Sequence, residues 1–221
     1  ITATKQVNAD SPFSFSIPLS QTRNDVNLYL TDEQGKTTRK TFNFVRLEHY
    51  DMLVDAAFTG DDGTLVNGVP CYATVGAAVK AVPSDNQKQV TIFIKNGQYQ
   101  ERVVVTSPYI SLIGEDRIGT HIYASEAVED RSAATMWARN CMYVDSTATG
   151  LTMENLTVEN SYPYKNGTDE QADALCIVAD QTICINVRLV SFQDTLLTDS
   201  RVKDETGNYA VTRQYFDKCY I

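Results

Sequence analysis

The sequence predicts an all-β chain, a right-handed parallel β-helix that forms an incomplete solenoid, with a helix capping its N-terminal end and a small antiparallel β unit before it. Three observations lead to this prediction. Short strand-like runs follow one another from residue 90 with a single convincing helix before them, three segments recur at near-constant spacing, and residues 1–48 alternate apolar with polar side chains. With 221 residues, the chain can hold one main domain and a small extra unit.

Residues 1–48 show the period-two pattern of half-buried antiparallel strands. Polar side chains separate the apolar residues of three runs, which are Phe13, Phe15 and Ile17, then Val26, Leu28 and Leu30, then Phe42 and Phe44. A turn is expected at residues 32–36, with Gly35 where a positive φ is needed. This unit resembles the closing strands of an immunoglobulin-like sandwich, so we expect a small sandwich-like unit or the remnant of such a domain.

Residues 49–221 are predicted to form the main domain. Residues 52–55 read as a short strand, and residues 72–82 place apolar side chains at helical spacing before Pro83, which cannot continue a helix. Further strands are expected at residues 90–95, 103–105, 110–113, 121–123 and 141–144, and the strands of a repeat follow them. The helix would cover the exposed strand edge at the N-terminal end of the stack.

A repeat favours the β-helix over a β-sandwich. Asn155, Asn186 and Lys218 each open a similar strand, and the spacings between them are 31 and 32 residues. Near-constant spacing without matching helices is typical of a β-solenoid, in which each turn buries its inward face by stacking on its neighbours. A sandwich would instead give turn signals every 8 to 12 residues or so.

Composition and charge exclude several classes of function. The net charge of −9 and the absence of a basic cluster give no electrostatic footprint for nucleic acid or an anionic membrane. No apolar run approaches the roughly 20 residues that span a bilayer, and the first residues lack the pattern of a leader, so we expect a soluble, processed or trimmed product. His49 and His121 stand far from any nucleophile motif, which leaves a serine or cysteine triad without its base.

The cysteines indicate core packing more than chemistry. Their count is odd and no CxxC spacing occurs, which disfavours a zinc site or a redox pair. We expect free cysteines that pack as small apolar residues, with a disulfide as a minority option. The five are Cys71, Cys141, Cys176, Cys184 and Cys219.

Residues 171–196 are the candidate functional segment. Two apolar runs, at residues 174–178 and 183–190, lead to Gln193 and Asp194, whose polar groups need hydrogen-bond partners if they leave water. A functional role is one interpretation of this pattern, and a solvated turn after a strand is the other.

Several segments resemble the pectin methylesterases, the pectinesterase family. GQYQE at 97–101, ISLIG at 110–114, QADAL at 171–175, QDTL at 193–196 and RQYFDKCYI at 213–221 are similar to elements of that family. The resemblance extends from about residue 52 to the end. QDTL with a downstream CYI is its specific part, whereas GxYxE alone would be weak.

The resemblance implies hydrolysis of the methyl esters of polygalacturonate (pectin), giving methanol and pectate with no metal or organic cofactor. It implies a secreted protein, extracellular, at the cell surface or periplasmic. Carried over, Asp194 takes the acid/base role, and Gln193 and Gln171 become oxyanion donors. The family's nucleophilic aspartate lies seven positions after the residue matching Cys219, which falls beyond Ile221, as does an arginine that orients it. We therefore expect the remaining β-helix residues in the parent or in a partner chain, or an inactive product.

Other interpretations remain open at this stage. Tyr162, Tyr164 and Trp137 are candidate sugar-stacking residues or plain loop aromatics, and Gln171 is a donor or an ordinary loop residue. Glu101 and Tyr99 are assigned to structure. The alternative functions are a non-catalytic glycan-binding β-helix and a related β-helix esterase or thioesterase with another substrate. Pectate-lyase activity is disfavoured because clustered carboxylates for calcium are not found at matching rungs.

Overall fold

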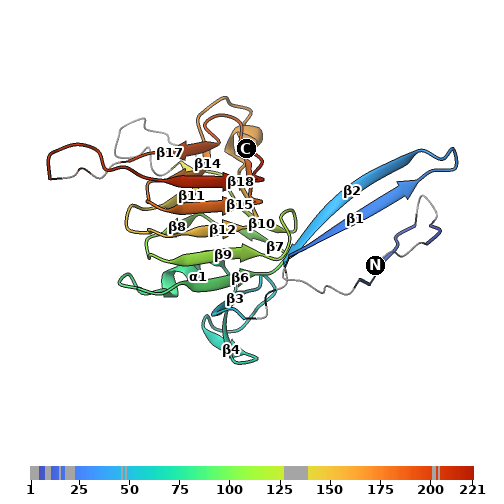
Figure 1. Ribbon diagram of the computed structural model, residues 1–221, viewed down its shortest axis with the longest axis horizontal. Coiled ribbons are helices and arrows are strands. Elements are labelled where there is room, and N and C mark those ends of the chain that lie inside the picture. The colour runs from blue at the N-terminus through green and yellow to red at the C-terminus, as the bar shows by residue number, and fades with distance from the viewer. Residues whose placement is uncertain are drawn as a thin grey trace.

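The computed structural model describes residues 5–7, 11–14, 16–17, 23–45, 47, 49–126, 139–200, 203 and 205–221. Three sheets form the main body (Figure 1). The first contains β7 (Gly97–Gln100), β10 (Thr120–Ala124), β13 (Thr157–Asn160) and β16 (Arg188–Val190). The second contains β8 (Val103–Val105), β11 (Asn140–Val144), β14 (Asp173–Ile177) and β17 (Leu196–Thr198). The third contains β3 (Met52–Val54), β4 (Thr64–Val66), β5 (Val69–Tyr72), β6 (Val90–Ile94), β9 (Ile110–Gly114), β12 (Thr152–Glu154), β15 (Thr182–Ile185) and β18 (Gln214–Asp217).

From β6 onward the chain visits the three sheets in a fixed cycle, and each strand pairs in parallel with the strand one turn earlier. Figure 1 shows the strands of the third sheet stacked in chain order from β6 to β18. The predicted parallel β-helix is confirmed. The short strand β4 pairs antiparallel with β5, at the end of the third sheet.

The sequence repeat corresponds to one turn of the solenoid. Thr157 pairs with Arg188, and Arg188 forms a parallel bridge with Tyr220, so the three aligned segments lie on successive turns. The residues that open them, Asn155, Asn186 and Lys218, have φ values of 60°, 54° and 54°. Asparagine adopts this left-handed conformation more readily than most residues, which suits it to a sharp corner between strands.

Side chains at that corner also bond from turn to turn. Nδ2 of Asn186 donates to Oδ1 of Asn155 at 2.7 Å, and Nδ2 of Asn155 donates to the carbonyls of Gly114 and Glu115 at 3.0 Å. Asn155 is 1% exposed, so these bonds satisfy polar groups that burial removes from water.

The core runs through the centre of the solenoid as rows of stacked apolar side chains. One row follows the register of the third sheet through Ile92, Leu112, Met153 and Cys184, all of them buried. Burial of one such aliphatic side chain is worth roughly 1.5–3 kcal/mol, but only while its neighbours above and below are in place. All five cysteines lie outside disulfide bonds; four are buried, and Cys219 is half-buried against the core.

Helix α1 (Val75–Ala81) lies beside β8 at the N-terminal edge of the second sheet (Figure 1). It begins later than predicted because β5 extends to Tyr72. The carboxylate of Glu101 accepts the backbone N–H of Val75 at 2.7 Å and of Gly76 at 2.8 Å, and so satisfies two donors at the helix start. The structural role expected of Glu101 is thereby defined.

A second helix, α2 (Tyr162–Asn166), was not predicted. It has five residues and ends at Gly167 in the left-handed conformation, between β13 and β14. Among the described residues, neither helix has the length and hydrophobicity needed to cross a membrane.

Residues 23–45 form a hairpin of β1 (Arg23–Thr31) and β2 (Thr37–Val45), with Gly35 at φ 80° in its turn, which projects from the solenoid (Figure 1). Val26 lies opposite Phe42 in the register. A bridge between Phe44 and Asp116 connects the hairpin to the solenoid. Residues 11–14 and 16–17, where a further strand was expected, are not in a strand, and Phe15 lies outside the described residues.

Candidate active site

A column of polar residues stands at the heads of the strands of the second sheet. The register pairs Asn140 with Asp173 and pairs Leu175 with Leu196, which sets Asp173 and Asp194 at equivalent positions on adjacent turns. A strand head at a corner of the solenoid is the place where a polar side chain can reach a surface while its strand stays in the core.

Arg139 connects the residues of this column. Its Nε donates to Oδ2 of Asp173 at 3.3 Å, its Nη2 to Oδ2 of Asp194 at 3.1 Å and its Nη1 to Oε1 of Gln171 at 2.5 Å. The structure thus brings together Gln171 and Asp194, two residues that the sequence singled out. Gln193 is exposed next to Asp194, and its backbone carbonyl accepts the N–H of Ala172 at 3.2 Å.

The polar groups differ in exposure. The side chain of Asp173 is fully buried, that of Arg139 is 7% exposed, and that of Asp194 is 36% exposed. Asp194 can therefore meet a ligand from solvent, whereas Asp173 lies behind it. Asp194 also has a φ of 57°, a conformation that is uncommon for a residue with a side chain and recurs at functional sites.

A buried amide fixes the backbone under this cluster. Nδ2 of Asn160 donates to the carbonyls of Arg139 at 2.8 Å and Asp173 at 3.1 Å. Oγ of Ser191 donates to the carbonyl of Ala172 at 2.5 Å and lies 3.2 Å from the carbonyl of Asn160. The strand heads of neighbouring turns are thereby tied to one another, which holds the side chains that they carry.

Burial raises the pKa of Asp173 to about 6. Desolvation of the charged form is the largest cause; the guanidinium of Arg139 opposes it, and the charge of Asp194 adds to it. The other oxygen of this carboxylate, Oδ1, is buried and has no hydrogen-bond partner among the described residues. Burial thus moves the pKa of Asp173 well above the ordinary value of an aspartate.

An aromatic pair lies beside the cluster. Phe192 is 62% exposed and directly precedes Gln193. The ring of Tyr164 packs edge-on against it, with 6.5 Å between the two ring centroids. The hydroxyl of Tyr164 donates to the carbonyl of Ser191 at 2.5 Å, so Tyr164 also supports the turn. Tyr162 is half-buried at the start of α2. Trp137, the third predicted stacking residue, lies outside the described residues.

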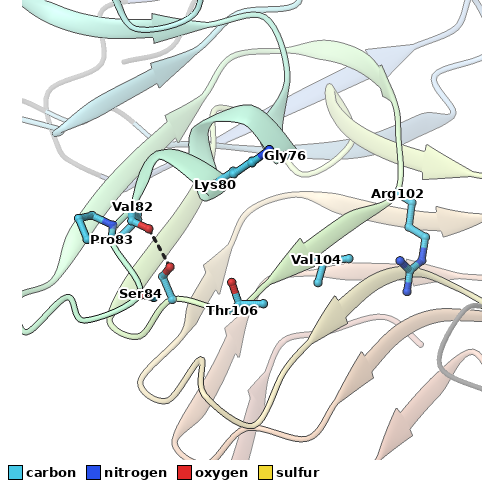
Figure 2. A pocket seen from close by; sticks show the side chains of 9 residues that line it. Gly76, Lys80, Val82, Pro83, Ser84, Arg102, Val104 and Thr106 are labelled. Atoms are coloured by element: carbon cyan, nitrogen blue, oxygen red, sulfur yellow. Dashed lines mark hydrogen bonds between the residues drawn. The ribbon is translucent and has the colours of Figure 1, made fainter. Parts of the chain in front are cut away.

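A separate hollow of about 540 Å³ lies between α1 and β8, and the predicted site residues that the structure describes do not line it. Figure 2 shows Lys80 on the α1 side, with Val104 and Thr106 on the strand side. The full lining comprises Gly76, Lys80, Val82, Pro83, Ser84, Arg102, Val104, Thr106 and Ser107.

Sequence reasoning missed Arg139, Asp173 and Phe192 as site residues. Asp173 was visible only as the middle residue of QADAL, although a carboxylate at the head of an all-apolar run was a usable signal. Arg139 forms no motif with the others, because 34 residues separate it from Asp173. Within the part of the chain that the structure describes, no group of three or more His, Cys, Asp or Glu side chains could hold a metal ion.

The fold and the cluster together define a class, that of parallel β-helix proteins with an acidic site at the strand heads of one sheet. The family model described as Pectinesterase matches residues 64–221, and the chain belongs to the pectinesterase family.

The comparisons with individual proteins agree. Probable pectinesterase 49 of Arabidopsis thaliana is 32% identical over 163 residues, and pectinesterase 1 of Citrus sinensis is 30% identical over 172 residues. These matches cover 70% and 77% of this chain, but only 39% and 26% of those proteins. The chain therefore spans less than half the length of these relatives.

Solved structures give the same picture. Pectin methylesterase from carrot aligns with a TM-score of 0.59 and 26% identity over 79% of this chain and 46% of its own. Pectin methylesterase from Yersinia enterocolitica aligns with a TM-score of 0.53 and 30% identity, over 67% of this chain and 48% of its own. A further pectin methylesterase, in complex with a hexasaccharide, shares the fold with a TM-score of 0.55 at 24% identity, over 69% and 46% of the two chains.

Proposed function

We propose that the protein containing this chain hydrolyses methyl esters of polygalacturonate, releasing methanol and leaving pectate. One observation carries the proposal: Gln171 and Asp194, from two segments similar to family elements, are held on one guanidinium at the heads of adjacent strands. Family membership supports the reaction class, since the relatives are named pectinesterases.

The proposed reaction has two half-steps. A nucleophilic aspartate that follows residue 221 attacks the ester carbonyl carbon, and the bond from that carbon to the methoxy oxygen breaks. Asp194 donates its proton to the departing methoxide, which leaves as methanol. Water then attacks the carbonyl carbon of the acyl-enzyme, Asp194 takes one proton from that water, and the bond from the carbon to the aspartate oxygen breaks, which restores the nucleophile. The galacturonic acid that is released loses its remaining acid proton to solvent and becomes the carboxylate.

The side-chain amides of Gln171 and Gln193 are proposed to donate to the oxygen that becomes negative in each half-step. One such donor is worth on the order of 3 kcal/mol of barrier, because it is already oriented when the charge develops. The exposed ring of Phe192, with Tyr164 against it, is a suitable surface for a pyranose ring. The substrate, a cell-wall polysaccharide, places the protein outside the cytoplasm, as a secreted, cell-surface or periplasmic product.

The test is methanol release from methylated pectin, without added calcium, by the protein that includes the residues following Ile221. Asp194→Asn is expected to lower kcat by at least about 100-fold, since it removes the proton donor and base. Asp169→Asn, which changes an exposed acid of the nearby loop, is the matched control and should stay within about twofold.

Two outcomes would overturn the assignment. One is the absence of methanol release by the wild-type protein. The other is an Asp194→Asn rate within a few-fold of wild type. Pectin binding with no turnover would instead support the glycan-binding alternative.

A further inference from the structure

Arg139 contacts three polar side chains of the candidate site while it is itself almost fully buried. Its guanidinium meets Asp173, Asp194 and Gln171 through three different nitrogens. An arginine guanidinium is a planar fork of donors with no acceptor, so three simultaneous contacts fix the relative positions of the three partners.

The contact to Gln171 determines which end of the amide faces outward. The oxygen and nitrogen of a glutamine amide have similar shapes, but an arginine can only donate. The amide must therefore present its oxygen to Nη1 of Arg139, at 2.5 Å, and its NH₂ group lies on the other side. That NH₂ is the group required of an oxyanion donor, and Gln171 is exposed.

Asp173 holds Arg139 in turn. It is fully buried, so it does not meet a ligand, and its Oδ2 accepts Nε of Arg139 at 3.3 Å. The backbone carbonyls of both residues accept the same Asn160 amide, so the pair is fixed by main chain as well as by charge.

We propose that Arg139 and Asp173 are positioning residues of the esterase site: Arg139 turns the NH₂ of Gln171 outward and aims the Asp194 carboxylate, and Asp173 holds the guanidinium in place. This inference rests on the proposed function for its catalytic meaning. The arrangement of Gln171 can be tested without it.

Kinetics provide the first test, on the protein that includes the residues following Ile221. Arg139→Ala is expected to lower kcat at least about tenfold with KM within about twofold, because the positioned groups, not the sugar contacts, are disturbed. Added guanidinium at tens of millimolar should restore several-fold of the loss, whereas equal urea or sodium chloride should not. A variant that had merely lost stability would not be rescued by a denaturant.

A double-mutant cycle tests whether Asp173 acts through Arg139. Asp173→Asn alone should lower kcat, but in the Arg139→Ala background it should cause no further loss. Arg213→Ala removes an exposed ion pair with Asp180 and is the matched arginine control, expected to keep wild-type kcat. Independent losses that multiply, or an Arg139→Ala variant that keeps kcat within about twofold, would overturn the proposal.

A readout without turnover separates the two proposals. In the 221-residue chain, the ¹⁵N–¹H signals of the Gln171 side-chain NH₂ should move on Arg139→Ala and stay in place on Arg213→Ala. If the wild-type protein releases no methanol while these signals behave as expected, the esterase assignment fails and the positioning of Gln171 stands. If the signals do not respond to Arg139→Ala, the positioning proposal fails whatever the activity.

Discussion

The buried carboxylate of Asp173 makes stability depend on pH in a direction that can be measured. Two effects compete at this group: burial favours the neutral acid, and the guanidinium of Arg139 favours the charged form. Because Asp173 is fully buried, burial prevails and the pKa rises from 3.8 to about 6. Asp173→Asn removes the titrating group while it keeps the shape of the side chain.

The sign follows from proton binding. Between pH values near 4 and 6 the folded protein holds the Asp173 proton and the unfolded chain does not, so rising pH lowers the free energy of unfolding. The shift from 3.8 to about 6 corresponds to on the order of 3 kcal/mol, fully present at pH values below 3.8 and lost as the pH passes about 6. About 1.4 kcal/mol of this stabilisation is lost between about pH 5 and pH 7.5.

Urea unfolding, followed by circular dichroism at about pH 5 and about pH 7.5, measures this difference. The wild-type protein should lose roughly 1.4 kcal/mol relative to Asp173→Asn between the two conditions. Comparing two variants cancels the other acids, which titrate in both. A difference that stays flat within about 0.5 kcal/mol would show that Asp173 titrates as in an unfolded chain. A difference of the opposite sign would show that Arg139 outweighs burial.

Three further predictions concern the scaffold and the aromatic pair. Gly114→Ala should lower the free energy of unfolding by about 1–3 kcal/mol in urea titrations, because its Cβ would lie 2.3 Å from the carbonyl oxygen of Asn155. Glu101→Ala should cost roughly 2 kcal/mol in the same assay, because two N–H groups at the start of α1 lose a charged acceptor. Phe192→Ala should raise KM for methylated pectin about three- to tenfold with unchanged circular dichroism, and an unchanged KM would exclude ring stacking there.

The fold could be predicted because the stacked turns of a solenoid require a repeating pattern in the sequence. Every turn must place an apolar residue over the one before it, and Asn155, Asn186 and Lys218 mark the same left-handed corner on three successive turns. Helix α2 escaped prediction because five residues are too few to show a helical period. The start of α1 was misplaced because the apolar Tyr72 fits a strand as well as a helix.

The candidate site was only half accessible from sequence. Gln171 and Asp194 stand in segments that resemble family elements, so their residue types drew attention. Asp173 lies in the same QADAL segment as Gln171 but does not carry the resemblance, and Arg139 lies in none of these segments. Their meeting depends on the register between turns and on side-chain direction, neither of which a linear pattern contains. The roles assigned to Gln171, Gln193 and Asp194, and the assignment of residues 1–48 to an immunoglobulin-like unit, stay predictions.

The buried charges of the cluster are better explained by what they position than by what they add to stability. Breaking a buried ion pair is costly, yet a pair of well-packed apolar side chains in the same volume is often as stable or more stable. Asp173 is buried in a strand whose other residues are all apolar, so its carboxylate carries a desolvation cost that an aliphatic side chain would not. A solenoid turn also contacts only its neighbours, which means that a polar site must be held from the adjacent turns. The Arg139 and Asp173 pair does this for Asp194 on the next turn, and that is a reason for a charge to persist where packing alone would favour a hydrocarbon.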